Sequence, residues 1–513
     1  MPTRPDILFL VLDTQRADRL SCYGYPHETS PHLDALAADA TLFRHAYATA
    51  QWTVPSHSSM FTGLYPSFHR TQQSFSVLPA ELTPLAERLQ AGGYFTAAFC
   101  NNPLVGVVNN GLRRGFYSFL NYSGLLTSRP NQAGRPITLF GRYRQVFKRM
   151  LAGVLRRMQD SFARSDALLE FAMTPLMLPV WQTALSFKGN TGRSLNDAAK
   201  LFIERKGVRR DQPVFSFVNL MGTHMPFHPP RRHLERFAPQ MLHNKDARRF
   251  IRRFNTDVFG WFAPLANVMG EEQQALLSGC YNAEVATQDD QLGLFFDKLR
   301  SSGALDRTLV IICADHGDHL GEHHFLGHSV SAYDVLLHVP LIIRDPAGDF
   351  ARGAERDDFV SLRRLFQTVL TGAGLAEKSE QTYTLAHSPD NDPDRGVVFA
   401  EVVTPQNVLN LMTKHKPELV RDRRCDQPRR AVWRKPYKLI ETGADLVELY
   451  DVTVDPGETQ NLRESQPAIV QELQERLRAF QRQADASQVV AGRVANQDDP
   501  QLRRRLRALG YLE

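Results

Sequence analysis

Four short apolar runs, each followed directly by polar side chains, constrain the fold of this 513-residue chain more than any other feature. The runs are rich in β-branched residues and alternate with helical patterns, which is typical of a mostly parallel sheet with crossover helices. They cover residues 7–12, 94–100, 214–220 and 308–314. The sequence therefore predicts an α/β fold in which helices cover both faces of a mixed, mostly parallel sheet.

The polar residues that follow these runs have the chemistry of a metal site. They are Asp13 after the first run, Asn101 and Asn102 after the second, His224 shortly after the third, and Asp315 and His316 after the fourth. In open α/β sheets, ligands bind beyond the carboxyl ends of the strands. Polar residues also resume at ordinary strand ends, but four endings with carboxylate, amide and imidazole groups favour one shared site.

The composition is that of a globular protein, and its mild basic excess is compatible with an anionic substrate. Apolar residues make up 42% and charged residues 23% of the chain, which excludes disordered and fibrous classes. Sixty-one basic residues against 55 acidic ones give a net charge of +6. This mild excess suits an anionic ester substrate and does not call for a nucleic-acid partner.

The cysteines and the N-terminal residues favour a cytoplasmic location. Five scattered cysteines include no Cys-x-x-Cys pair, so neither a disulfide framework nor a zinc ribbon is expected. The first apolar run is too short for a signal sequence and has no cleavage site after it. No segment offers the ~20 uninterrupted apolar residues that a membrane-spanning helix needs.

The chain is predicted to divide into a catalytic domain, residues 1–394, and a small C-terminal α+β subdomain, residues 395–513. The C-terminal strands are expected at 395–403, 431–441 and 446–451, with helices at 467–484 and 502–512. A helical insertion is expected at about 122–205. Its segment 142–158 has an apolar stripe and a basic opposite face. We favour packing over the site for this segment, with binding to an anionic membrane surface as the alternative.

The segment from Trp52 to Pro66 is the most specific in the chain. Thr53 stands just before Pro55, which fits the first turn of a helix running to about Thr62. A hydroxyl at a helix N-terminus lies where backbone N–H groups and the macrodipole favour an anion. The alternative role of Thr53 is that of an N-cap.

Three motifs together resemble the sulfatase family of the alkaline phosphatase superfamily. They are Asp13 after a strand, Thr53-Val-Pro-Ser-His57 with Thr62-Gly63, and Ala314-Asp-His-Gly-Asp-His-Leu-Gly-Glu-His323. Weaker matches occupy residues 30–36, 281–299, 339–343 and 448–462. The resemblance implies an alkaline-phosphatase-like fold.

The resemblance also implies roles for individual residues. It implies metal ligands at Asp13, Thr53, Asp315 and His316, and catalytic or substrate-binding groups at His57, Asn101, Asn102, His224 and His328. One divalent cation is expected, either manganese, zinc or calcium. A second site that uses His319, His323 or His324 is the alternative.

Two departures from the family pattern affect the expected chemistry. Sulfatases oxidise a Cys or Ser of the motif to formylglycine, but the methyl group of Thr53 prevents an aldehyde from forming. A Thr nucleophile must instead form an ester intermediate, which suits phosphoryl transfer. Thr14 stands where many sulfatases have a second Asp, which makes calcium less fitting than manganese or zinc.

We therefore expect a metal-dependent hydrolase that cleaves sulfate, phosphate or phosphonate esters through a Thr53 intermediate, with phosphate-type esters favoured. One alternative is a phosphotransferase that moves a headgroup to an alcohol acceptor at a membrane surface. The other is a catalytically silent sulfatase-like protein. The spelling His319-x-x-Glu-His323 also matches a metalloprotease motif, but Gly321 and the preceding strand argue against the helix which that motif needs.

Overall fold

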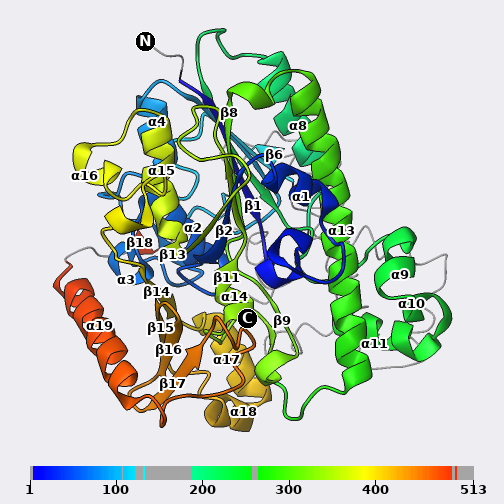
Figure 1. Cartoon of the computed structure of the whole chain (residues 1–513). Coiled ribbons are helices and arrows are strands. Elements are labelled where there is room, and N and C mark those ends of the chain that lie inside the picture. The colour runs from blue at the N-terminus through cyan, green and yellow to red at the C-terminus, as the bar shows by residue number, and fades with distance from the viewer. Residues whose placement is uncertain are drawn as a thin grey trace.

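The four apolar runs form four adjacent parallel strands in the computed structural model. The structure describes residues 4–106, 108–122, 131–132, 188–256, 264–487 and 492–493. The four strands lie in the order β8 (Thr308–Cys313), β1 (Asp6–Leu12), β7 (Val214–Leu220) and β4 (Phe95–Cys100). Because β1 pairs in parallel with β7 and β8, and β7 with β4, all four carboxyl ends reach the same edge of the sheet (Figure 1).

The sheet continues on both sides of these strands and reaches ten strands within the described residues. The outer strands are β5 (Ser118–Asn121) and β6 (Asn131–Gln132) on one side, and β12 (Leu341–Arg344), β2 (Thr41–Tyr47), β11 (His338–Val339) and β13 (Ala354–Ser361) on the other. Antiparallel pairs occur at β5–β6, β8–β12, β2–β12 and β2–β11. The predicted mixed, mostly parallel α/β sheet is therefore confirmed.

Alternate side chains of β1 enter two different cores, as the period of a strand requires. Ile7, Phe9 and Val11 pack with residues of α2, α4 and α15, whereas the even-numbered leucines pack with residues of α1, α8 and α13. Helices thus cover both faces of the sheet (Figure 1). These helices are α1 (Pro31–Ala37), α2 (Thr53–Thr62), α4 (Leu85–Ala91), α8 (Thr191–Glu204), α13 (Glu271–Ser301) and α15 (Leu365–Gly372).

A second sheet forms from the C-terminal part of the chain. Its antiparallel strands are β14 (Val397–Val402), β15 (Arg429–Arg434), β16 (Tyr437–Thr442) and β17 (Leu446–Asp451), and α19 (Pro467–Ala486) packs against them (Figure 1). The prediction of one strand over 431–441 is wrong, because the chain reverses at Lys435 and Pro436. Pro436 lacks the N–H that a continuous central strand would need.

Several predictions fall on residues that the structure does not describe. The amphipathic segment 142–158, most of the insertion at 122–205 and the helix at 502–512 lie outside the described residues. The division into domains at residue 394 also stays a prediction. In the part of the chain that is described, no helix is long and apolar enough to cross a bilayer. All five cysteines lie in that part, and all are free thiols.

A buried charge cluster joins the second sheet to the loop that follows β8 at the carboxyl edge of the first sheet. The Lys438 ammonium on β16 is fully buried and donates to Asp334 Oδ1 and to Glu458 Oε1, both at 2.6 Å. It also lies 4.8 Å from the centre of the Trp433 ring. Asp334 begins the short helix α14 (Asp334–Leu337), which follows the loop that carries the predicted metal ligands.

Replacing Lys438 should destabilise the protein strongly. Lys438→Ala leaves two buried carboxylates without their cation, so we expect the free energy of unfolding to fall by about 3–5 kcal/mol in denaturant titration. The matched control is Lys435→Ala, since Lys435 is 41% exposed and pairs with Asp357 at the surface. Its loss should cost less than about 1 kcal/mol. Equal losses in the two variants would contradict this description of the cluster.

Candidate active site

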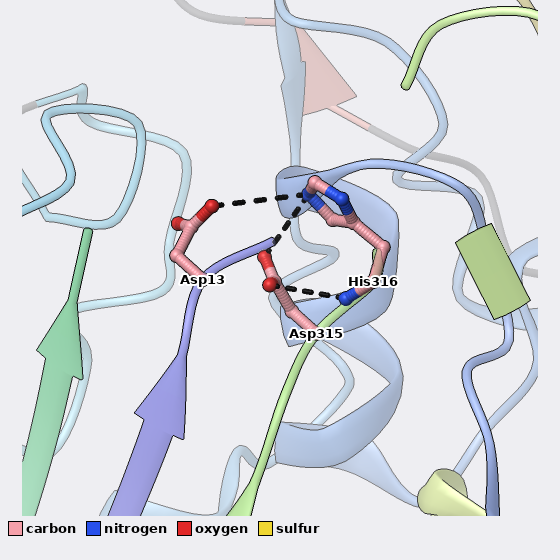
Figure 2. A group of neighbouring side chains, drawn as sticks. All are labelled: Asp13, Asp315 and His316. Carbon is pink, nitrogen blue, oxygen red and sulfur yellow. Dashed lines mark hydrogen bonds and ion pairs between the residues drawn. The ribbon is translucent and has the colours of Figure 1, made fainter. Parts of the chain in front are cut away.

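Asp13, Asp315 and His316 meet at the carboxyl edge of the large sheet, where β1 and β8 end (Figure 2). One ligand atom from each lies within 4.8 Å of the other two, and all three residues are fully buried. His316 Nε2 is 3.3 Å from Asp315 Oδ2 and 4.0 Å from Asp13 Oδ1. The parallel pairing of β1 with β8 brings together residues that are about three hundred positions apart.

The hydrogen bonding of this cluster fits a bound cation. Asp13 Oδ1, Asp315 Oδ2 and His316 Nε2 are buried and have no hydrogen-bond partner among the described residues. Buried polar atoms are rarely left unpaired, because each costs about 1–3 kcal/mol. Burial, together with the nearby Asp13 carboxylate, raises the pKa of Asp315 well above its usual range. Two carboxylate oxygens and one imidazole nitrogen suit a divalent metal ion.

Thr53 lies beside this cluster as the first residue of α2. Trp52 is the N-cap residue of that helix, so the alternative role of Thr53 as the N-cap is wrong. The Asn102 amide Nδ2 donates to Asp13 Oδ2 at 2.6 Å and to Thr53 Oγ1 at 3.3 Å. One amide group therefore joins the predicted nucleophile to a predicted metal ligand. As predicted, α2 ends at Thr62, and Gly63 takes a left-handed conformation after it.

His57 is placed to support the site rather than to face it. It is fully buried, and its Nδ1 lies 2.9 Å from the Thr53 carbonyl oxygen and 3.5 Å from Asp315 Oδ2. Its Nε2 lies 3.5 Å from the amide nitrogen of Asn219. Burial lowers the pKa of His57 to about 4, so the ring is neutral at pH 7. Both ring nitrogens have neighbours, and its catalytic role stays a prediction.

Three imidazole rings gather beside the carboxylates. The His328 ring lies 4.5 Å from the His316 ring and 5.2 Å from the His224 ring, centre to centre. In each ring Nδ1 is held by an oxygen: the Gly317 carbonyl for His316, the Met225 carbonyl for His224 and the Asp318 carboxylate for His328. This arrangement leaves the three Nε2 atoms for ligands. At metal sites, a hydrogen bond to one ring nitrogen likewise orients the imidazole so that the other nitrogen can bind the metal.

The two predicted substrate-binding asparagines differ in their surroundings. Asn102 contacts the cluster directly, as described above. Asn101 donates from Nδ2 to Thr191 Oγ1 at 3.3 Å, at the start of α8, and its buried Oδ1 has no partner among the described residues. Asn101 therefore lies between the site and α8, and its role in substrate binding stays a prediction.

Sequence reasoning assigned no role to three residues that shape the site. Arg16 is buried and joins the loop after β1 to the loop after β8 by bonds to Asp18, Glu322 and the Asp318 carbonyl. Asn219 lies 3.4 Å from Asp13 Oδ2, and Asp318 holds His328. Asn219 could have been recognised, because it is an amide in an otherwise nearly apolar strand.

The histidines after Asp318 do not build a protease motif. His319 lies in the short strand β9 (His319–Leu320), and His323 and His324 form a turn, so rejection of the helical motif is confirmed. His319 bonds Ser331 Oγ, and His323 stacks on Tyr333 at 3.7 Å. Over the described ranges, Asp13, Asp315 and His316 are the only group of three with ligand spacing. The second metal site therefore has no support from the described residues.

Thr14 adopts a left-handed conformation with φ of 61°, which is unusual for a β-branched residue. Its hydroxyl donates to the Asp13 carbonyl at 2.6 Å and lies 3.3 Å from Thr223 Oγ1. Its backbone N–H points to Asp315 Oδ1 at 3.4 Å. Thr14 therefore contributes to the site through its backbone, while its side chain bonds elsewhere.

Comparison with solved structures defines the class of fold. The phosphonate monoester hydrolase of Agrobacterium radiobacter superposes with a TM-score of 0.63 at 22% identity, covering 94% of this chain and 96% of that one. A putative sulfatase from Bacteroides fragilis superposes with a TM-score of 0.64 at 15% identity, covering 94% and 97%. The chain thus has the alkaline-phosphatase-like fold.

Comparison with sequences defines the family. The family model described as Sulfatase matches residues 5–375, and the chain therefore belongs to the sulfatase family of ester hydrolases. An ulvan-active sulfatase of Formosa agariphila is 23% identical over 476 residues, covering 90% of this chain and 77% of the relative. A multifunctional alkaline phosphatase superfamily protein of Trinickia caryophylli is 25% identical over 415 residues, covering 72% and 74%.

Removing one carboxylate should abolish metal binding. With manganese at a hundred times its Kd, we expect the free energy of unfolding of the native chain to rise by about 2.7 kcal/mol. Asp315→Asn should show no such rise in the same denaturant titration, because one anionic ligand is lost. The matched control is Asp306→Asn, whose side chain is 75% exposed, and it should behave like the native chain. An unchanged response of Asp315→Asn would contradict the assignment of this ligand.

Proposed function

We propose that this protein is a metal-dependent hydrolase of phosphate-type esters that uses Thr53 as its nucleophile. The observation that carries the proposal is an unmodified secondary alcohol at the N-terminus of α2, joined to Asp13 through the Asn102 amide. Threonine cannot be oxidised to the aldehyde of formylglycine. A covalent ester on Thr53 is therefore the intermediate that this side chain supports.

The reaction proceeds in two displacements. Thr53 Oγ1, after losing its proton to solvent, forms a bond to phosphorus while the bond from phosphorus to the alcohol oxygen breaks. The leaving alkoxide takes up one proton, from solvent or from His328, whose Nδ1 is held by Asp318 and which then regains a proton from solvent. Water then forms a bond to phosphorus, the bond to Thr53 Oγ1 breaks, and one proton of the water returns to Thr53.

The chain's own residues hold the reacting groups in place. Asp13, Asp315 and His316 would hold the cation, and the Nε2 atoms of His224 and His328 would contact the transferred group or the leaving oxygen. When bound, the cation supplies positive charge that lowers the pKa of a nearby hydroxyl and offsets negative charge on the ester. The N-terminus of α2 adds partial positive charge at the same place.

We further propose manganese or zinc, rather than calcium, as the native cation. Calcium prefers six to eight oxygen ligands. Two carboxylates and an imidazole make a smaller, partly nitrogenous set that is typical of transition metals. The Thr14 hydroxyl bonds the Asp13 carbonyl and adds no carboxylate to this set.

Replacing the nucleophile should abolish turnover. Thr53→Ala should lower kcat/KM for 4-nitrophenyl phosphate by roughly 10³-fold or more in the presence of manganese, as loss of a nucleophile does in other hydrolases. Thr53→Ser keeps a hydroxyl and should retain measurable activity. The matched control is Thr62→Ala at the opposite end of α2, where the hydroxyl bonds only the helix backbone carbonyl of Ser58 and the Leu64 N–H.

Two results would oppose this proposal. Turnover that survives in Thr53→Ala would remove Thr53 as the nucleophile. A higher kcat/KM of the native chain for 4-nitrophenyl sulfate than for 4-nitrophenyl phosphate would contradict the preference for phosphate-type esters.

A further inference from the structure

A polar cavity of about 320 Å³ lies beside the candidate active site. It is bounded by the start of α8, by the segment that follows β7 and by one face of α13. Its volume is at the lower end of the range for small-molecule sites. We call it the side pocket, and its lining includes Lys188, Thr191, Gly222, Glu284, Thr287 and Gln288.

The walls of the side pocket are continuous with the catalytic edge. Gly222 lines the pocket, and the next residue, Thr223, donates through its hydroxyl to the Asp13 carbonyl at 2.8 Å. His224 follows and belongs to the imidazole group. On the other wall, Thr191 accepts a hydrogen bond from Asn101, the neighbour of Asn102. A substrate whose ester lies at Thr53 would therefore extend toward this pocket.

The charges of the side pocket cancel. The half-buried Lys188 ammonium donates to Glu284 Oε1 at 3.0 Å and to the Gly222 carbonyl at 2.8 Å. Pro226 is the one apolar side chain of the lining apart from the small residues. The pocket is thus polar but carries no net charge.

Several polar groups in the lining are left for a ligand. Gln288 is only 3% exposed, and its Oε1 accepts a hydrogen bond from the Gly222 N–H at 3.0 Å. Gln291 Oε1 is buried and has no partner among the described residues. The first N–H groups of α8, at Thr191 and Gly192, have no partner inside the helix. The lining of the side pocket therefore offers both hydrogen-bond donors and hydrogen-bond acceptors to a ligand.

We infer that the side pocket binds the neutral, hydroxyl-bearing part of the substrate's alcohol, such as a sugar or another polyol, and discriminates against a second anionic group. The inference rests on the proposed function for the position of the ester. Hydroxyl groups both donate and accept, so they match a lining that offers unpaired amide N–H groups, an amide oxygen and a charged pair.

The paired charge explains the discrimination. A second anion in the pocket would lose its hydration and would lie beside the Glu284 carboxylate, while Lys188 is already neutralised by that carboxylate. An aryl group would cover these polar groups, and among the lining residues only the His228 ring and Pro226 could pack against it. A polyol satisfies those groups without adding charge.

Filling the side pocket should lower the activity on esters of a sugar more than the activity on esters of a phenol. Thr287→Trp places a large ring in the cavity from α13, and Leu294→Trp places the same ring on the same helix where Leu294 is 67% exposed. We expect Thr287→Trp to lower kcat/KM for glucose 6-phosphate at least tenfold relative to 4-nitrophenyl phosphate. Leu294→Trp should leave the ratio within twofold. An unchanged ratio in Thr287→Trp would overturn the inference.

Changing the charge of the pocket should change its selectivity. Glu284→Gln keeps the size of the side chain and leaves the Lys188 ammonium unpaired. The ratio of kcat/KM for 6-phosphogluconate to that for glucose 6-phosphate should then rise roughly tenfold, because an opposite charge at this distance is attracted strongly in a buried site. An unchanged or lower ratio would contradict a pocket that discriminates by charge.

Binding without turnover distinguishes this inference from the proposed function. Methyl glucoside should give saturation-transfer NMR signals with the native chain and with Thr53→Ala, and these should be lost in Thr287→Trp but kept in Leu294→Trp. If no phosphate ester is hydrolysed while this pattern holds, the proposed function fails and the pocket stands. If the esters are hydrolysed but methyl glucoside binds equally to both Trp variants or to neither, the pocket inference fails.

Discussion

The electrostatics of two buried carboxylates determine how this site is built. Asp13 and Asp315 end adjacent parallel strands, so the pairing of β1 with β8 forces them together in a place without solvent. Like charges in such a place repel each other unless a cation or a proton lies between them. A cation at this place would contact the unpaired oxygens of Asp13 and Asp315 and the unpaired His316 Nε2. The Asn102 amide donates to the second oxygen of Asp13.

The position of residue 53 at this edge of the sheet makes its side chain important for the proposed chemistry. Helix α2 begins with Thr53 beside the carboxylates. In our proposal, the side chain at this position decides which intermediate can form. The hydroxyl of a threonine can act as a nucleophile after it loses its proton, but a threonine cannot be oxidised to an aldehyde. Membership of the sulfatase family establishes an ester hydrolase. Our proposal of phosphate-type esters rests on the chemistry of Thr53.

Much of this arrangement could be predicted from the sequence, because strand ends and motifs are local signals. The four runs and the start of α2 follow from short segments, and the predicted ligands Asp13, Asp315 and His316 follow from two short motifs. Contacts between distant segments could not be predicted in this way. The side pocket, for example, combines residues of the separate segments 188–192, 222–228 and 284–291. The predicted strand over 431–441 is wrong because the chain reverses at Lys435 and Pro436, between β15 and β16.

The most direct test of the account is mass spectrometry of acid-quenched enzyme taken during turnover of a phosphate ester with manganese present. The account predicts that the peptide containing Thr53 gains the mass of one phosphoryl group, with the modification on Thr53 itself. An unmodified Thr53 peptide together with a phosphoryl group on another residue, or a sulfuryl group that forms only from sulfate esters, would contradict it.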